Sequence, residues 1–213
     1  MSLFPVSAPP PQVDVKPYFE LRQRFERRTN RDFDSRIDDD RGDLLSRWRV
    51  GAKLDFRNGW RGEIQYQYAH DLAWTRARNF SDESSDVSLA YAESALPGWT
   101  ATLGRQKIAV GQQRLIGPSE WANVPRSMDG VRFRNPEWDL FAFKIGVGAP
   151  RSGDARVAGL VHQNKMYGDT MLVFKHDQMA AGSQDIWTLS HLFVKSFGKV
   201  TVDAEAALQT GRN

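Results

Sequence analysis

The chain has 213 residues, of which 40% are hydrophobic and 26% are charged, and it contains seven Trp and twelve Phe. This apolar and aromatic content excludes an intrinsically disordered protein, and the absence of cysteine excludes a disulfide framework or a thiolate metal site. The net charge of +3 is too small to indicate a class of partner, and the sequence has no run of about eighteen apolar residues that would predict a transmembrane helix.

The first residues, MSLFPVSAPPPQVDV, differ from the rest of the chain. They contain neither a charged leader nor a long apolar core, so they do not match a secretory signal. Pro9, Pro10 and Pro11 favour an extended conformation. We therefore expect an extended N-terminal segment over residues 1–16, followed by a single folded unit over residues 17–213.

Residues 47–68 show a pattern that repeats along the chain, an alternation of apolar and polar side chains. This period of two predicts β-strands, each with one apolar and one polar face. The RNG sequence between two such strands predicts a three-residue hairpin loop, because that length places apolar residues opposite each other. In this register Val50 pairs with Tyr66, and Gly59 takes the left-handed position, which costs glycine no steric energy.

Similar segments occupy most of the remaining chain and bring the expected number of strands to about eleven. They span residues 18–28, 86–93, 99–106, 129–134, 138–148, 155–163, 170–176, 186–197 and 200–209. The alternation places Leu89 and Tyr91 on the apolar face of their strand. It also places Phe141 and Phe143 on the apolar face and Lys144 on the polar face. No segment has the period of an amphipathic helix, so we expect an all-β fold.

The connections between these strands alternate in length. The short ones are RNG, ALPG, NPE and FGK, and the long polar ones cover residues 29–43, 70–85 and 107–128. Trp60, Trp99 and Trp138 directly follow three of the short turns, as in an aromatic belt at a membrane–water interface. Short turns at one end, long loops at the other and strands of roughly ten residues are typical of outer-membrane barrels.

A soluble β-sandwich is the alternative, because its strands also alternate, with apolar faces packed inward and charges in water. Such a domain could bind acidic sugars. The polar face of these strands is rich in arginine, however, whereas a solvated face usually mixes Lys, Glu, Thr and Ser. Arginine keeps its charge and forms paired hydrogen bonds with carboxylates and phosphates. The alternation alone favours the sandwich, but the turn lengths, the Trp positions and the arginine content together bring the two architectures about level.

Residues 103–133, LGRQKIAVGQQRLIGPSEWANVPRSMDGVRF, resemble the alginate-export family of bacterial outer-membrane porins. The similar elements are LGRQ, QRLIG, W-x-N and R-S-M-D-G-V-R in this order, and the resemblance extends over about residues 17–211. It implies an antiparallel up-and-down transmembrane β-barrel in the outer membrane, without enzymatic activity, whose cationic lumen passes anionic polysaccharide. Barrels of this family have about eighteen strands, so about eleven strands would form an N-terminal part of one.

In such a barrel the apolar side chains face lipid and the charged ones face the lumen, because an Arg in mid-bilayer on the lipid side costs about 2–4 kcal/mol. The expected lumen cations are Arg22, Arg24, Arg47, Arg49, Lys53, Arg61, Arg105, Arg114, Arg126, Arg132, Arg134 and Lys144. The expected counter-charges are Glu20, Glu26, Asp55, Glu63, Asp203 and Glu205. The long loop 107–128 can fold into the pore, where Arg105, Arg114 and Arg126 are candidates for a constriction.

The expected partners are an anionic polysaccharide or a small anionic solute, together with outer-membrane lipid, and no nucleic acid. The resemblance also implies periplasmic proteins of an export complex. A solute-uptake porin is a further alternative, because a fold does not fix a substrate. Asp38, Asp39, Asp40 and Asp43 could recruit Ca²⁺, but a solvated extracellular loop is strongly favoured over a calcium site. The histidines lack metal-ligand spacing, so no metal or cofactor is expected.

Overall fold

The computed structural model describes most of the chain. The described residues are 13–29, 33, 36, 41–56, 58–73, 83–147, 154–179 and 182–212. Asp38, Asp39 and Asp40 of the calcium hypothesis lie outside them. Across these ranges no helix combines the length and apolar character that crossing a membrane requires. The regular elements found in them are β-strands.

Eleven strands form one antiparallel sheet in which each strand pairs with its neighbours in sequence. The strands are β1 (Val13–Arg28), β2 (Arg41–Phe56), β3 (Trp60–Ala73), β4 (Ser84–Leu96), β5 (Trp99–Gln106), β6 (Ser127–Arg134), β7 (Trp138–Val147), β8 (Asp154–His162), β9 (Asp169–Met179), β10 (Gly182–Phe197) and β11 (Val200–Arg212). This order confirms the predicted all-β, up-and-down fold. Within the described ranges β1 and β11 each pair with one strand, so the sheet is open. β1 begins inside the segment 1–16 that we expected to be extended.

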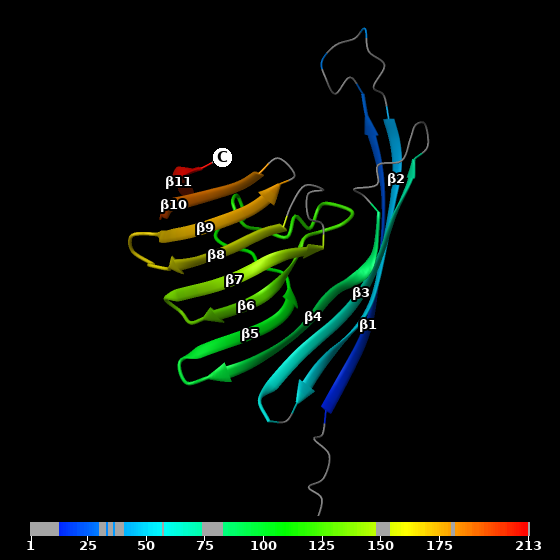
Figure 1. Cartoon of the computed structure of the whole chain (residues 1–213), viewed down its shortest axis with the longest axis horizontal. Helices are drawn as coiled ribbons and strands as arrows, with labels where there is room; N and C mark the ends of the chain where they lie inside the picture. Colours follow the sequence, from blue (N-terminus) through cyan, green and yellow to red (C-terminus); the bar gives the residue numbers. More distant parts are fainter. Residues whose placement is uncertain are drawn as a thin grey trace, which may run out of the picture.

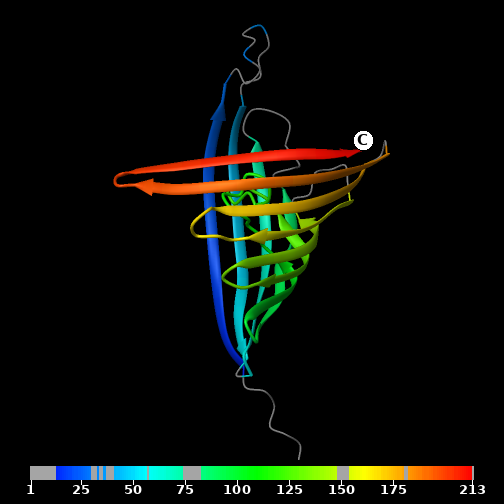
Figure 2. The ribbon, with the colours of Figure 1, turned by 90° about the vertical axis from the view of Figure 1, so that its left-hand side faces the viewer.

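The sheet is curved and twisted into a trough (Figure 1). β1 to β4 form one wall and β5 to β11 form the other, and the connection between β5 and β6 lies between the walls. In the view turned by 90°, β10 and β11 run across the direction of β1 and β2 (Figure 2). Neighbouring strands are rotated with a constant hand, and this rotation accumulates over many strands. The result is a concave inner face and a convex outer face.

The two faces of the trough carry different side chains. On the outer face apolar side chains are exposed, as for Phe19 at 66% and Leu103 at 61%. On the inner face polar side chains are buried, as for Arg47 at 3% and Gln67 at 1%. A soluble sandwich would bury the apolar face and expose the charges. The observed arrangement is that of a membrane barrel, in which apolar side chains meet lipid and polar ones meet the lumen.

The hairpin between β2 and β3 has the predicted register. Val50 pairs with Tyr66. The amide of Gly59 donates to the carbonyl oxygen of Phe56 at 3.0 Å, and the φ angle of Gly59 is 88°. This is the left-handed conformation that glycine adopts without steric cost. The apolar residues of both strands therefore share the outer face.

The three tryptophans that follow short turns lie at one end of the trough. Trp60, Trp99 and Trp138 are the first residues of β3, β5 and β7, which run in the same direction. Trp60 and Trp138 are partly exposed on the outer face, at 46% and 36%. An amphipathic indole is well placed at the level of the lipid head groups. The positions of these side chains are therefore those of an aromatic belt.

The expected orientation of Leu89 and Tyr91 in β4 is wrong. Leu89 is buried on the inner face, and the hydroxyl of Tyr91 donates to the carboxylate of Glu63 there at 3.0 Å. The pairing of β3 with β4 shifts register between Gln65 and Tyr66. Such a β-bulge places an extra residue in one strand and reverses the alternation beyond it. A period-two pattern read from sequence does not reveal the bulge.

Strand β7 also faces the opposite way from the prediction. Phe141 and Phe143 are buried on the inner face, whereas Ala142 and Lys144 are exposed on the outer face. The cause is the connection between β5 and β6, whose apolar side chains, including Ile108, cover the inner side of β7. The alternation of β7 was predicted correctly. Only the covering segment determines which of its two partly apolar faces is buried.

Candidate functional site

Residues 107–126, which connect β5 to β6, fold into the trough, and we call them the inner loop. The side chains of Ile108, Val110 and Ile116 pack against apolar inner residues of β7 to β9, including Phe143. Ile108 is completely buried. Complete burial of one large apolar side chain stabilises the folded protein by about 1.5–3 kcal/mol. This packing fixes one side of the inner loop to the wall.

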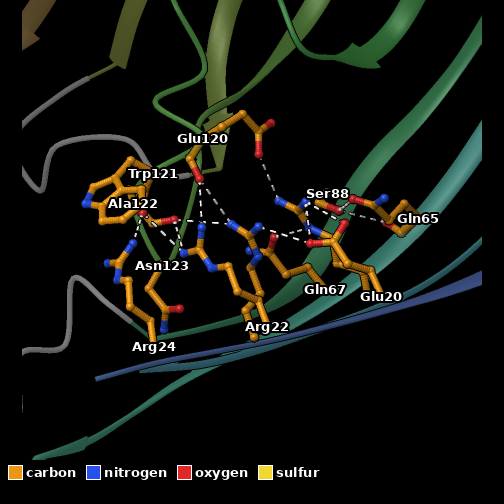
Figure 3. A network of polar contacts seen from close by, with 12 residues as sticks. Glu20, Arg22, Arg24, Gln65, Gln67, Ser88, Glu120, Trp121, Ala122 and Asn123 are labelled. Atoms are coloured by element: carbon orange, nitrogen blue, oxygen red, sulfur yellow. Dashed lines mark hydrogen bonds and ion pairs between the residues drawn. The ribbon is translucent and has the colours of Figure 1, made fainter. Parts of the chain in front are cut away.

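The other side of the inner loop is held by arginines of β1 and β2 (Figure 3). Arg22 donates to the carbonyl oxygens of all three residues 120–122 at 3.0, 3.2 and 3.0 Å. Arg47 donates to the first and the last of these oxygens at 3.5 and 3.2 Å. Arg24 donates to the middle one, and its guanidinium lies 4.5 Å from the centre of the Trp121 ring. We call Arg22, Arg24 and Arg47 the arginine latch.

Arg49 connects the latch to two carboxylates. Its Nε donates to Oε1 of Gln67 at 2.8 Å, and its Nη1 lies 3.3 Å from the carboxylate of Glu20. Its Nη2 lies 3.5 Å from the carboxylate of Glu120 on the inner loop. Glu20 also accepts a hydrogen bond from Arg47 at 3.1 Å. Charge-assisted hydrogen bonds of this kind hold guanidinium groups in fixed directions.

Glu120 is the acidic group of the inner loop in this network. The ammonium of Lys107 lies 2.5 Å from its carboxylate. Burial alone would raise the pKa of Glu120, but Lys107 and the guanidinium groups of Arg49 and Arg47 outweigh burial, and the pKa is lowered. A carboxyl group with a lowered pKa stabilises the folded arrangement above its ordinary pKa. That stabilisation is lost as the pH falls through the lowered value.

We therefore predict that the inner loop stays bound from neutral pH to below about 4.3, the ordinary pKa of Glu, and loosens in stronger acid. Single-channel conductance of the full-length channel, recorded as a function of pH, should rise only at the acid end. In the variant Glu120→Gln this acid-dependent rise should be absent, because no carboxyl group titrates there. Identical pH profiles for the variant and the parent channel would contradict the role of Glu120.

A cavity of about 570 Å³ lies on the inner face beside Arg49. Its cationic lining residues are Lys16, Arg49, Lys53, Lys107, Arg132 and Arg134. Tyr18 and Tyr91 also line it, and both hydroxyls donate to the carboxylate of Glu63, at 2.6 and 3.0 Å. The cations and hydroxyl groups of the cavity can donate hydrogen bonds to anionic groups.

Several of the other predicted lumen residues form ion pairs along the inner face. Arg132 contacts both carboxylate oxygens of Asp139, at 2.8 and 2.5 Å, and Arg134 lies 3.3 Å from Glu93. On the inner loop, Arg114 lies 3.4 Å from Asp203 and 3.6 Å from Glu205. Arg24 lies 2.6 Å from Glu26. Arg61 and Asp55 line a smaller cavity near the β2–β3 turn, and Arg126 is half-buried in the inner loop.

Two of the predicted lumen cations lie elsewhere. Arg105 pairs across the sheet with Asp129, and Asp129 pairs with Lys144. These residues alternate with Gln106 and Phe143, which are buried on the inner face, so they belong to the outer face. For Lys144 the error follows from the reversed orientation of β7. Arg105 was assigned to the pore because it precedes the long loop, whereas its position in β5 directs it outward.

Sequence reasoning missed several residues of the cavity. Tyr18 occupies the same face of β1 as Glu20 and Arg22, so its position was available from the alternation. Tyr91 was hidden by the bulge in β4. Lys107 and Glu120 belong to the inner loop, and no strand pattern applies to them. For such residues only the folded position of the loop identifies the contact.

Residues 17–191, most of the chain, match the alginate-export family. No curated protein matches the sequence. Two mutant forms of a porin from Rhodopseudomonas blastica align with 92% of this chain and 84% of the porin chain, at 12% and 13% identity and a TM-score of 0.33. On the family match, the chain belongs to the alginate-export family of bacterial outer-membrane β-barrel channels.

Proposed function

We propose that the inner face guides an anionic polysaccharide of the alginate type across the outer membrane by passive, electrostatically selected diffusion. The observation that carries this proposal is the cavity of about 570 Å³ with its six cationic lining residues. Six cations outnumber the three carboxylates that also line the cavity, and a cleft with such an excess of one sign of charge concentrates the oppositely charged solute and speeds its entry. The carboxylates of a uronic-acid polymer are the matching groups for Lys and Arg side chains.

The acidic residues of the inner face support passage instead of tight binding. Conduction requires that each site be weak enough for the solute to leave it. Glu20, Glu63 and Glu93 lie among the cations that line the cavity. They orient the guanidinium groups and lower the local positive potential. A polymer would therefore move along a series of weak contacts, and no covalent step is needed.

In this proposal the inner loop forms the constriction of the passage. It is fixed on one side by apolar packing and on the other by the arginine latch. Arg22 and Arg47 are largely occupied by loop carbonyls, so their main role is to hold the loop. Lys53 and Arg134 are exposed on the inner face and line the cavity. They are better candidates for direct contact with the solute.

We predict that Lys53→Glu combined with Arg134→Glu lowers the anion preference of the full-length channel several-fold, because the sign of the local field is reversed. The measurement is the reversal potential in planar bilayers across a salt gradient, followed by block with oligomers of mannuronate and guluronate. The control is Lys199→Glu in the β10–β11 turn, which makes the same kind of charge reversal at one position outside the trough. An unchanged reversal potential in the double variant would contradict the proposal.

A porin for the uptake of small anionic solutes is the second candidate, and the same cationic cavity favours it. The oligomer experiment distinguishes the two. Brief block events that lengthen with the number of sugar units indicate a polymer pathway, because a longer chain occupies more weak sites at once. Conductance of small anions without any block by oligomers would favour uptake.

A further inference from the structure

Two tyrosines and a carboxylate lie together at the wall of the cavity of about 570 Å³. Tyr18 belongs to β1, Glu63 to β3 and Tyr91 to β4, and Glu63 pairs directly with Tyr91 across the sheet. The hydroxyl of Tyr18 donates to one carboxylate oxygen of Glu63 at 2.6 Å, and the hydroxyl of Tyr91 donates to the other at 3.0 Å. We call these three residues the tyrosine cluster.

A glycine lets Tyr18 reach Glu63, although β2 lies between their strands. Gly51 pairs directly with Tyr18, and a Cβ atom at Gly51 would lie 2.6 Å from both Cζ and the hydroxyl oxygen of Tyr18. Only glycine therefore leaves room for the ring to cross β2. Gln65 holds the ring there, because its Nε2 donates to the hydroxyl oxygen of Tyr18 at 2.6 Å. The Oε1 of Gln65 in turn accepts a hydrogen bond from Ser88 at 2.8 Å.

The hydrogen bonds of the tyrosine cluster determine what it can offer to a solute. A phenol hydroxyl has one proton to donate, and its oxygen can also accept hydrogen bonds. Both protons are directed at Glu63, whose ionised carboxylate only accepts. The two hydroxyls, which line the cavity, therefore present oxygen lone pairs to a solute. Lone pairs accept a hydrogen bond from a hydroxyl group of the solute, whereas a carboxylate has no proton to give them.

Two lysines lie close to the tyrosine cluster and line the same cavity. Lys16 precedes Tyr18 by two residues in β1, a separation of about 7 Å along a strand. Lys53 pairs directly with Glu63, and paired residues have Cβ atoms about 4.5–5.5 Å apart. A sugar ring that carries both a carboxylate and hydroxyl groups can therefore contact a cation and an acceptor at the same time.

We infer that the tyrosine cluster selects anions that carry hydroxyl groups over anions that carry none. This inference rests on the proposed function and names the feature, besides charge, by which the cavity recognises its solute. The cations of the cavity attract any anion. The tyrosine oxygens form hydrogen bonds only with a solute that has a donor, and they stay without a partner beside a solute that has none. Uronic-acid units, which carry carboxylates and hydroxyls on one ring, meet both conditions.

The test compares two polyanions with equal numbers of carboxylates as blockers of the full-length channel in planar bilayers. Oligomers of mannuronate and guluronate carry hydroxyl groups, and oligomers of acrylate carry none. The readout is the ratio of the block time of the oligouronate to that of the oligoacrylate. In the double variant Tyr18→Phe with Tyr91→Phe this ratio should fall roughly five-fold, the effect of one lost hydrogen bond. The matched control, Tyr66→Phe with Tyr68→Phe, removes two hydroxyls from the outer face of β3 and should leave the ratio unchanged.

A second variant, Glu63→Gln, changes the same hydrogen bonds while both tyrosine hydroxyls remain. A glutamine side chain has one acceptor oxygen, so one tyrosine proton becomes free for a carboxylate of the solute. Loss of the negative charge should lengthen block by both polyanions, and the free proton should lengthen block by oligoacrylate further, so that the ratio again falls.

An unchanged ratio in the Tyr18 and Tyr91 double variant would overturn the inference. A merely structural role of the tyrosines would change both block times by the same factor, and the ratio would not move. Failure of the proposed transport function gives a different result, in which neither polyanion blocks the parent channel. That result would overturn the transport function and this inference with it.

Discussion

Replacing Arg22 and Arg47 together by alanine should widen the passage of the full-length channel. These two side chains donate five hydrogen bonds to the carbonyl oxygens of residues 120–122. A hydrogen bond to a charged group contributes about 1.5–3 kcal/mol. Losing even two of them shifts the balance between bound and released loop by on the order of 4 kcal/mol, or about a thousandfold. The apolar packing of Ile108 would still hold the opposite side of the loop.

The expected readout is single-channel conductance in planar bilayers, which should rise and become noisier as residues 120–122 move. The matched control is Lys53→Ala with Arg61→Ala, which also removes two cations from the inner face. Lys53 and Arg61 lie near the β2–β3 turn and line cavities there. This control should lower anion preference and leave the conductance steps nearly unchanged. If both double variants gave the same conductance, the latch would have no role in narrowing the pore.

The features that sequence predicted well depend on local repetition. The register of the β2–β3 hairpin follows from the RNG loop length and from the alternation on both sides of it. The exposure of Phe19 and Leu103 follows from the same alternation. Each of these features involves residues that are adjacent in sequence or paired through a short turn. Short-range patterns determine them because a shift of one residue would reverse every side chain of a strand.

The features that sequence did not predict depend on contacts between distant segments. The bulge opposite Gln65 reverses the second half of β4. The inner loop buries Phe143 and so determines the inner face of β7. The arginine latch joins β1 and β2 to residues far along the chain, 100 positions later for Arg22 with Ala122 and 75 positions later for Arg47 with Ala122. The arginines of the latch, which the sequence assigned to the lumen as solute contacts, therefore also hold the inner loop in place.

The inner face of the sheet contains buried charged side chains, which are costly unless they have partners. Buried charges are tolerated when they are paired and hydrogen-bonded. Arg132 with Asp139, and Arg49 with Glu20 and Gln67, meet this condition. Removing one partner would leave the other in an enclosed site. The ion pairs that support the wall therefore also limit which cations are available to a passing solute.

Leu103→Arg should strongly impair insertion of the full-length protein into lipid bilayers, whereas Leu96→Arg should be tolerated. Both leucines are exposed on the outer face, at 61% and 46%. Leu103 lies between Trp99 and Arg105 in β5, in the middle of the apolar band, and Leu96 pairs with Trp99 at the turn. An arginine facing lipid costs about 2–4 kcal/mol at the bilayer centre and about 0–1 kcal/mol near its surface.

The measurement is the urea midpoint of folding into liposomes for the parent and both variants, with gel mobility of unheated samples as a check. The two substitutions are chemically identical and occur on the same face, so any difference between them reports depth in the membrane. Only a hydrocarbon layer around the outer face penalises one position and spares the other. If Leu103→Arg folded as readily as Leu96→Arg, the apolar band would not lie in lipid, and the inner face would not be a lumen.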